Sequence, residues 1–280
     1  MARISNEAKT RYTERIKEYK ASVDDILKKE AEILASRDED GARASYNKLE
    51  LADITLDTVS YYILMNSLSA YLLGMKNEAH LNAARKACYK SIIYLEDTVS
   101  SIIDAPFSEY EERLSAIEEF DDESRHALLK KLGFSIRSII EGFGENSKWK
   151  WSFVEIDGRF ASVAKNFLDL KNLVSGMDPR SPGYEARTAH LALAKRLLQQ
   201  SADKYRQKYE LSTHRIDDFK LAINYLSGLR RLHIVLGDAV EAQDLKKKIE
   251  IWRAKMESDS QKLELRVKAS KRKAARTGSK

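Results

Sequence analysis

The segment from Thr58 to Met75 carries no charged residue, although Asp57 and Lys76 flank it directly. Across the longer stretch from Leu49 to Ile103, apolar residues recur at the three- and four-residue steps of a helix face, which predicts two helices joined near Gly74. The first helix has two apolar seams: Ala52, Leu56, Val59, Ile63, Asn66, Ala70, Leu73 and Leu51, Ile54, Thr58, Tyr62, Met65, Leu68, Leu72. Because both seams must be covered, we expect this helix in the middle of a packed helical assembly.

The same uncharged segment has to be compared with a membrane span. Its length is near the lower limit for a spanning helix, roughly 17–25 residues. Ser60, Asn66, Ser67 and Ser69 interrupt it, and its first turns lack aliphatic density. We therefore favour a buried helix of a water-soluble body.

The rest of the chain has the same helical character. Only three prolines and eleven glycines occur in 280 residues, too few for a sandwich or barrel with many turns. Helical periodicity predicts an all-α fold of about nine helices in stacked antiparallel hairpins, as a helical bundle or a degenerate repeat array. The most regular face runs Trp149, Phe153, Ile156, Phe160, Val163, Phe167, Leu170, Val174.

Turn-rich segments suggest how the chain is divided. The run from Gly142 to Ser147 is the best candidate for a boundary, giving an N-terminal helical half (1–144) and a C-terminal helical half (145–268). Beyond Val267 the apolar pattern stops, so we expect a disordered basic tail at 269–280. Whether the two halves form one domain or two is open at this stage.

Two hairpin turns share a local pattern. In each, a turn glycine is followed five residues later by an alanine, as in Gly74 with Ala79 and Gly237 with Ala242. This resembles part of a tetratricopeptide unit, and the resemblance implies a degenerate repeat of helical hairpins. The aromatic residue of that repeat is absent, since Ala83 and Lys246 stand at its positions. A constant period of about 34 residues is absent as well.

The patterns that carry chemistry are sparse. One Glu-x-x-His spacing, Glu123 to His126, fits a bundle metal site, but such a site needs a second copy of the motif. His190 and His233 lie on or beside apolar faces, and Cys88 lies in a helix seam, so we interpret all three as interior or boundary residues. The sequence contains no phosphate-binding glycine pattern. We expect neither an enzyme nor a resident metal or cofactor.

A short aromatic and basic run precedes the regular face. Trp149 belongs to that face, whereas Trp151, which follows Lys148 and Lys150 in the sequence, points away from it. An exposed tryptophan beside lysines is typical of partner-binding sites, so Trp151, Lys148 and Lys150 are candidate contacts. Packing of Trp151 on a neighbouring helix is the alternative.

Positive charge is concentrated at the C-terminal end. Residues 262–280 hold eight Lys or Arg and one Glu, a net charge of +7. Because the whole chain has a net charge of +6, the remaining residues have a net charge of −1. The basic residues Lys268, Lys271, Arg272, Lys273 and Arg276 could bind phosphate backbones or an anionic membrane. A merely solubilising end accounts for them equally well.

Together these features predict a non-catalytic protein-protein interaction or scaffold module with a protein partner. The alternative is a protein that associates with nucleic acid or an anionic membrane through the basic tail. A single cysteine and the absence of an apolar leader fit a cytoplasmic protein. The regular face from Trp149 to Val174 could also pair two copies in a homodimer.

Overall fold

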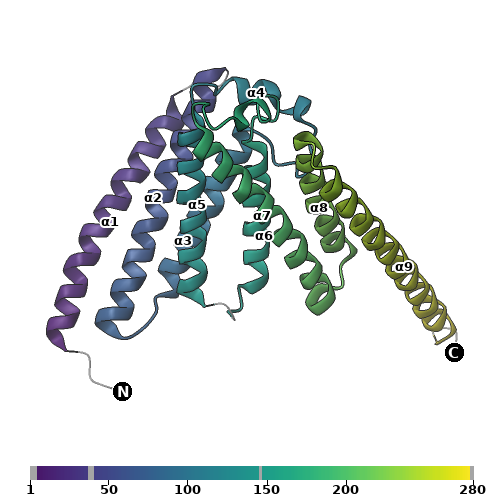
Figure 1. Ribbon diagram of the computed structural model, residues 1–280. Coiled ribbons are helices and arrows are strands. Elements are labelled where there is room, and N and C mark those ends of the chain that lie inside the picture. The colour runs from purple at the N-terminus through teal and green to yellow at the C-terminus, as the bar shows by residue number, and fades with distance from the viewer. Residues whose placement is uncertain (1–4, 37–40, 145–146, 278–280) are drawn as a thin grey trace. The chain divides into compact units, whose positions relative to one another are not determined.

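The computed structural model describes residues 5–36, 41–144 and 147–277, with side chains as far as Leu265. Within these residues all regular structure is helical, which confirms the predicted all-α fold (Figure 1). The α-helices are α1 (Asn6–Ala35), α2 (Ala42–Leu73), α3 (Glu78–Thr98), α4 (Glu111–Ser115), α5 (Asp122–Phe143), α6 (Lys150–Asn166), α7 (Tyr184–Lys208), α8 (Ile216–Leu236) and α9 (Ala239–Thr277). Three short turns join them: η1 (Phe107–Glu109), η2 (Ser175–Met177) and η3 (Tyr209–Thr213), of which η3 is π-helical.

The chain forms two compact units, Met1–Leu197 and Leu198–Lys280. We call them the first and second unit. Their division falls inside α7, whereas the sequence suggests a boundary after residue 144. That position lies within the first unit because α3 and α5, which precede it, both pack against α6, which follows it.

Helix α2 is the centre of the first unit. It packs against α1, α3 and α5, which lie beside it in Figure 1. Ala52, Leu56, Val59 and Met65 of α2 are completely buried. Burial is less complete towards the end of the helix, where the Tyr71 side chain is 86% exposed. Among the described residues, no helix combines the length and apolar character needed to cross a membrane.

The turn between α2 and α3 is built by its own residues, as predicted. Gly74 adopts the left-handed conformation with φ 66°, and its amide donates to the carbonyl of Ala70. The side chain of Asn77 accepts from the amides of Ala79 and His80, which caps α3. The buried Asn66 of α2 accepts from the Asn77 amide at 2.9 Å, so it also fixes the position of that cap.

The region after α6 differs from the sequence prediction. The regular face predicts a helix to Val174, but α6 ends at Asn166 and Val174 is exposed. Asp169 explains part of this, because its Oδ1 accepts from the amides of Lys171 and Asn172 in a local turn that competes with the helix. The segment between α3 and α5 likewise forms only two short elements, η1 and α4.

The second unit is held together by aromatic side chains. The rings of Tyr205 and Tyr225 stack with centroids 5.5 Å apart, and those of Tyr209 and Phe219 stack at 4.9 Å. Trp252 of α9 covers Phe219 at 5.9 Å. These contacts join the end of α7, η3, α8 and α9 around one small core.

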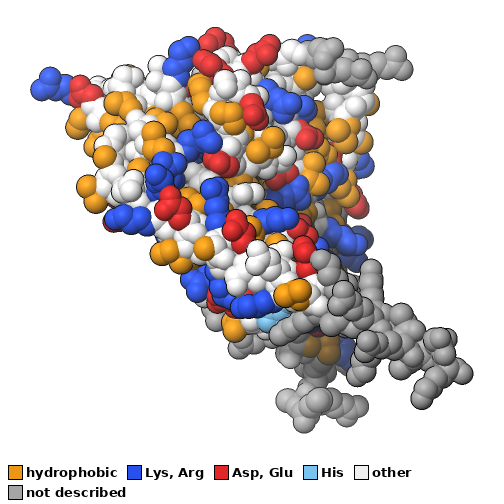
Figure 2. Space-filling view, turned by 90° about the vertical axis from the view of Figure 1, so that its right-hand side faces the viewer, with side chains coloured by type: hydrophobic (Ala, Val, Ile, Leu, Met, Phe, Trp, Pro, Cys, Tyr) orange, Lys and Arg blue, Asp and Glu red, His pale blue; other side chains and the backbone are white. Residues whose placement is uncertain are grey.

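Helix α9 continues through most of the segment predicted to be a disordered tail. Its backbone is helical to Thr277, in keeping with the high helix propensity of alanine, lysine and arginine. Its described surface carries ion pairs between neighbouring turns, such as Lys255 with Asp259 at 2.5 Å. Figure 2 shows one face of the molecule on which acidic, basic and hydrophobic side chains are interspersed.

Burial of His190 should make the first unit sensitive to acid. Its Nε2 lies 2.7 Å from the Ala164 carbonyl oxygen, and burial lowers the pKa of His190 to about 4. An unfolded imidazole takes up its proton near 6.5, so between pH 6.5 and 4 the unfolded chain binds more protons and stability falls as the pH falls. The total loss from this residue is about 3 kcal/mol.

We therefore predict that His190→Gln flattens the pH dependence of stability. Urea unfolding at pH 7 and pH 4 should show a wild-type loss that exceeds the variant's loss by about 3 kcal/mol. Equal losses in the two proteins would contradict a neutral, buried imidazole at this position.

Candidate functional site

The first unit contains a cavity of about 660 Å³. One side is formed by η1, α4 and the turn that follows, and another by the start of α5. The rest is formed by the turns before and after η2 and by the first turn of α7. Its lining residues are Phe107, Glu111, Leu114, Ser115, Glu118, Asp121, Asp122, Glu123, Arg125, Leu168, Asp169, Lys171, Asn172, Leu173, Pro182, Gly183 and Arg187. The volume is within the range of about 300–1,000 Å³ that is typical of ligand pockets.

Two buried polar side chains at the end of α6 hold one wall in place. Lys165 Nζ donates to the Ala105 carbonyl at 2.8 Å. Asn166 Nδ2 donates to the carbonyls of Ser100 at 2.8 Å and Ile102 at 3.1 Å. Both side chains are completely buried. These bonds attach the loop between α3 and η1 to α6, and that loop leads directly into the η1 and α4 side of the cavity.

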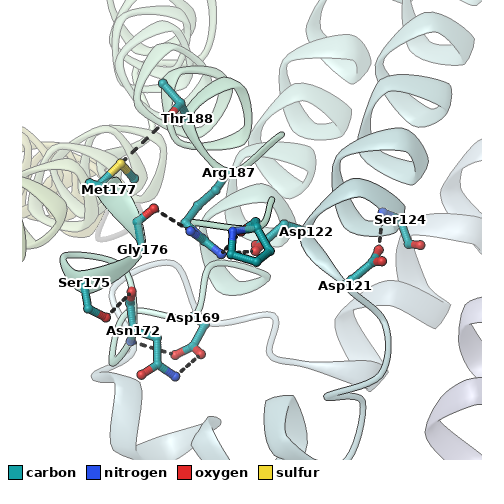
Figure 3. A network of polar contacts seen from close by, with 11 residues as sticks. Asp121, Asp122, Ser124, Asp169, Asn172, Ser175, Gly176, Met177, Arg187 and Thr188 are labelled. Carbon is teal, nitrogen blue, oxygen red and sulfur yellow. Dashed lines mark hydrogen bonds and ion pairs between the residues drawn. The ribbon is translucent and has the colours of Figure 1, made fainter. Parts of the chain in front are cut away.

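An arginine attaches the opposite wall to α5 (Figure 3). Arg187 of α7 donates through Nη2 to Asp122 Oδ2 at 2.5 Å and to the Pro182 carbonyl at 3.1 Å, and through Nη1 to the Gly176 carbonyl at 2.5 Å. A Cβ added at Gly176 would collide with the guanidinium, so only glycine permits this close approach. These bonds join the first turn of α5 to η2 and to the turn before α7.

Arg125 lines the cavity from the first turns of α5 but has few partners. Its side chain is buried, with a residue exposure of 7%, and its Nε has no hydrogen-bond partner. Nη2 makes one long bond, to the Ile117 carbonyl at 3.4 Å. Within the described part of the chain, no carboxylate lies within ion-pair distance of it. Burial lowers the pKa of the guanidinium, while Asp122 and Asp169 act in the opposite direction.

The charged side chains that line the cavity are mostly negative. Six carboxylates (Glu111, Glu118, Asp121, Asp122, Glu123, Asp169) face three cations (Arg125, Lys171, Arg187), which leaves three negative charges.

Structural bonds occupy several of these carboxylates. Lys171 pairs with Glu111 at 3.1 Å. Asp121 caps α5 by accepting from the Ser124 amide at 2.8 Å, a bond that lowers the pKa of Asp121 (Figure 3). The carboxylates of Glu118 and Glu123 are both exposed and have no hydrogen bond or ion pair to any described residue. They are therefore available to a cationic ligand.

The partner contacts predicted from the sequence lie elsewhere. Lys148 is exposed and pairs with Glu78 at 3.0 Å, while Lys150 lies over the ring of the half-buried Trp151 at 5.2 Å. These residues are at the start of α6, and the cavity is beyond its end, about 25 Å away along the helix. The structure groups the three residues but does not join them to the cavity, so their role in binding stays a prediction.

The structure does not describe the side chains of the basic tail. The side chains of Lys268, Lys271, Arg272, Lys273 and Arg276 lie outside the described residues. Their proposed contacts with nucleic acid or membranes stay a prediction.

The other residues singled out by the sequence are accounted for by packing and local bonds. Cys88 is buried, which raises the pKa of its thiol to about 12. His233 Nδ1 lies 2.9 Å from Asp238 Oδ2 at the turn into α9. In the described part of the chain, no group of three or more His, Cys, Asp or Glu side chains is placed to hold a metal ion.

Comparison with known proteins places the chain in one family. The model of the TP0443 family matches residues 8–260. The chain belongs to the TP0443 family. No curated protein and no solved structure matches the chain. The family description names no activity or partner, and the resemblance to tetratricopeptide hairpins stays a prediction.

The contact between Gly176 and Arg187 can be tested by a double-mutant cycle. Gly176→Ala should destabilise the protein by about 2 kcal/mol, because the displaced guanidinium loses charge-assisted hydrogen bonds. In an Arg187→Ala background the same substitution should cost less than about 0.5 kcal/mol. Chemical denaturation of the four proteins measures both effects, and an equal cost in both backgrounds would contradict the contact.

Proposed function

We propose that this protein is a non-catalytic interaction module that binds a lysine- or arginine-rich segment of a partner protein in the acidic cavity. The observation that carries the proposal is the excess of three negative charges around a concave site of about 660 Å³. A cleft lined by one sign of charge concentrates ligands of the opposite sign. We further propose a cytoplasmic location, in line with the single, buried cysteine.

The bonding of the carboxylates supports binding over catalysis. Asp121 caps α5, Asp122 pairs with Arg187, and Asp169 accepts from the turn that follows it. Each of these carboxylates already serves the structure. The carboxylates of Glu118 and Glu123 are exposed and free to form ion pairs with a ligand, as expected for a site that binds its ligand through charge.

The affinity should rest on these two glutamates. Glu118→Lys/Glu123→Lys changes the cavity charge from −3 to +1 and should weaken the binding of an amidated, dye-labelled hexalysine peptide about tenfold. Fluorescence anisotropy at low salt measures the change, and added salt should weaken wild-type binding because exposed charges are screened.

A matched control separates the cavity from the overall charge of the chain. Glu14 and Glu32 are exposed residues of α1, which forms no part of the cavity lining. Glu14→Lys/Glu32→Lys has the same net charge as the cavity variant and should bind the peptide within about twofold of wild type. Equal losses in the two double variants, or no binding to the wild-type protein, would overturn the proposal.

A further inference from the structure

The buried Arg125 of the cavity indicates which chemical group the ligand carries. Arg125 is 7% exposed, its Nε lacks a partner, and its one side-chain hydrogen bond to the described residues is the long contact with the Ile117 carbonyl. A guanidinium offers five N–H donors in a planar fork, and leaving such donors unpaired in a buried position is costly. An acceptor supplied by a ligand would remove this cost.

A carboxylate is the acceptor that best fits a guanidinium. The two oxygens of a carboxylate match the fork and allow two parallel hydrogen bonds. Water or a carbonyl would satisfy single donors but would leave the positive charge without a counter-charge. The ligand atom nearest Arg125 is therefore expected to carry negative charge.

The acidic rim of the cavity, in contrast, favours positive charge on the ligand. Glu118 and Glu123 are unpaired there, and the lining as a whole is negative by three charges even with Arg125 included. A ligand that satisfies both parts of the cavity is negative at one point and positive next to it. In a polypeptide, this combination occurs where a chain ends in lysine or arginine.

We infer that the cavity binds the C-terminal end of a basic polypeptide, whose terminal carboxylate pairs with Arg125 while its basic side chains face Glu118 and Glu123. This inference rests on the proposed function and adds the requirement for a chain end. An internal basic segment lacks the carboxylate and leaves Arg125 without a counter-charge. A free basic amino acid carries the same two groups, so the test includes it.

Peptide amidation gives the sharpest test because it changes only the terminal group. Dye-labelled hexalysine with a free C-terminal carboxylate should bind wild-type protein about tenfold more tightly than its amide, although the amide carries one more positive charge. Attraction to an acidic rim alone would favour the amide. The sign of the difference therefore separates pairing with Arg125 from general electrostatic attraction.

Two variants then assign the effect to Arg125. In Arg125→Met the preference for the free carboxylate should disappear or reverse, and in Arg125→Lys it should shrink because an ammonium cannot form the two parallel bonds. Unchanged far-UV circular dichroism would show that the helices persist. A preference that survives in Arg125→Met would overturn the inference.

The outcomes also distinguish the two proposals. If both peptides bind wild-type protein equally and Glu118→Lys/Glu123→Lys weakens both, the chain-end inference fails while the proposed function stands. If neither peptide binds, both fail. Displacement of the free-acid peptide by L-lysine at equal concentration would assign the site to a free amino acid and overturn the requirement for a chain end.

Discussion

Two fully buried polar side chains at the last turn of α6 hold the candidate site together. Lys165 and Asn166 donate to three carbonyls of the loop between α3 and η1, at Ser100, Ile102 and Ala105. Burying an ammonium group costs several kcal/mol unless it is paired. Here the Ala105 carbonyl accepts from Lys165, and the ring of Tyr110 lies 5.2 Å from its Nζ. The loop can therefore take only a restricted path, and it sets the position of η1 and α4.

The cost of burying a charged group without a partner also distinguishes the two arginines of the cavity. Arg187 is satisfied by three oxygens and acts as a structural tie between the walls. Arg125 of α5 is more deeply buried than Arg187 but makes one long bond. The two arginines of the cavity thus differ: Arg187 joins parts of the wall, whereas Arg125 keeps an unpaired donor, which we propose pairs with the ligand. The acidic rim then selects ligands that bring positive charge with their acceptor.

Local sequence patterns predicted much of the fold. The seams of α2 and the Gly74 turn depend on residues within a few positions of one another, and both were found. Prediction failed at the end of α6, where apolar spacing continues to Val174 although the helix stops at Asn166. The side chain of Asp169 reorganises the following turn, and periodicity does not report that competition.

The cavity was missed because its residues come from distant parts of the chain. Arg187 meets Asp122 across 65 positions, and Lys165 meets Ala105 across 60. One signal was available: Arg125 stands three residues before Leu128 and seven before Leu132, on the apolar face of α5. A charged residue on such a face must find a partner or line a cavity. The candidate contacts at Lys148, Lys150 and Trp151 came instead from local composition, which is a weaker guide to a site.

The account depends most on where a basic chain contacts this protein. Hydrogen–deuterium exchange with and without free-acid hexalysine measures this directly along the chain, because bound segments open less often. We expect slower exchange in residues 107–125 and 168–187, the segments that form the cavity. Slower exchange at 147–151 or 262–280 instead, or no change anywhere, would contradict the assignment of the cavity as the binding site.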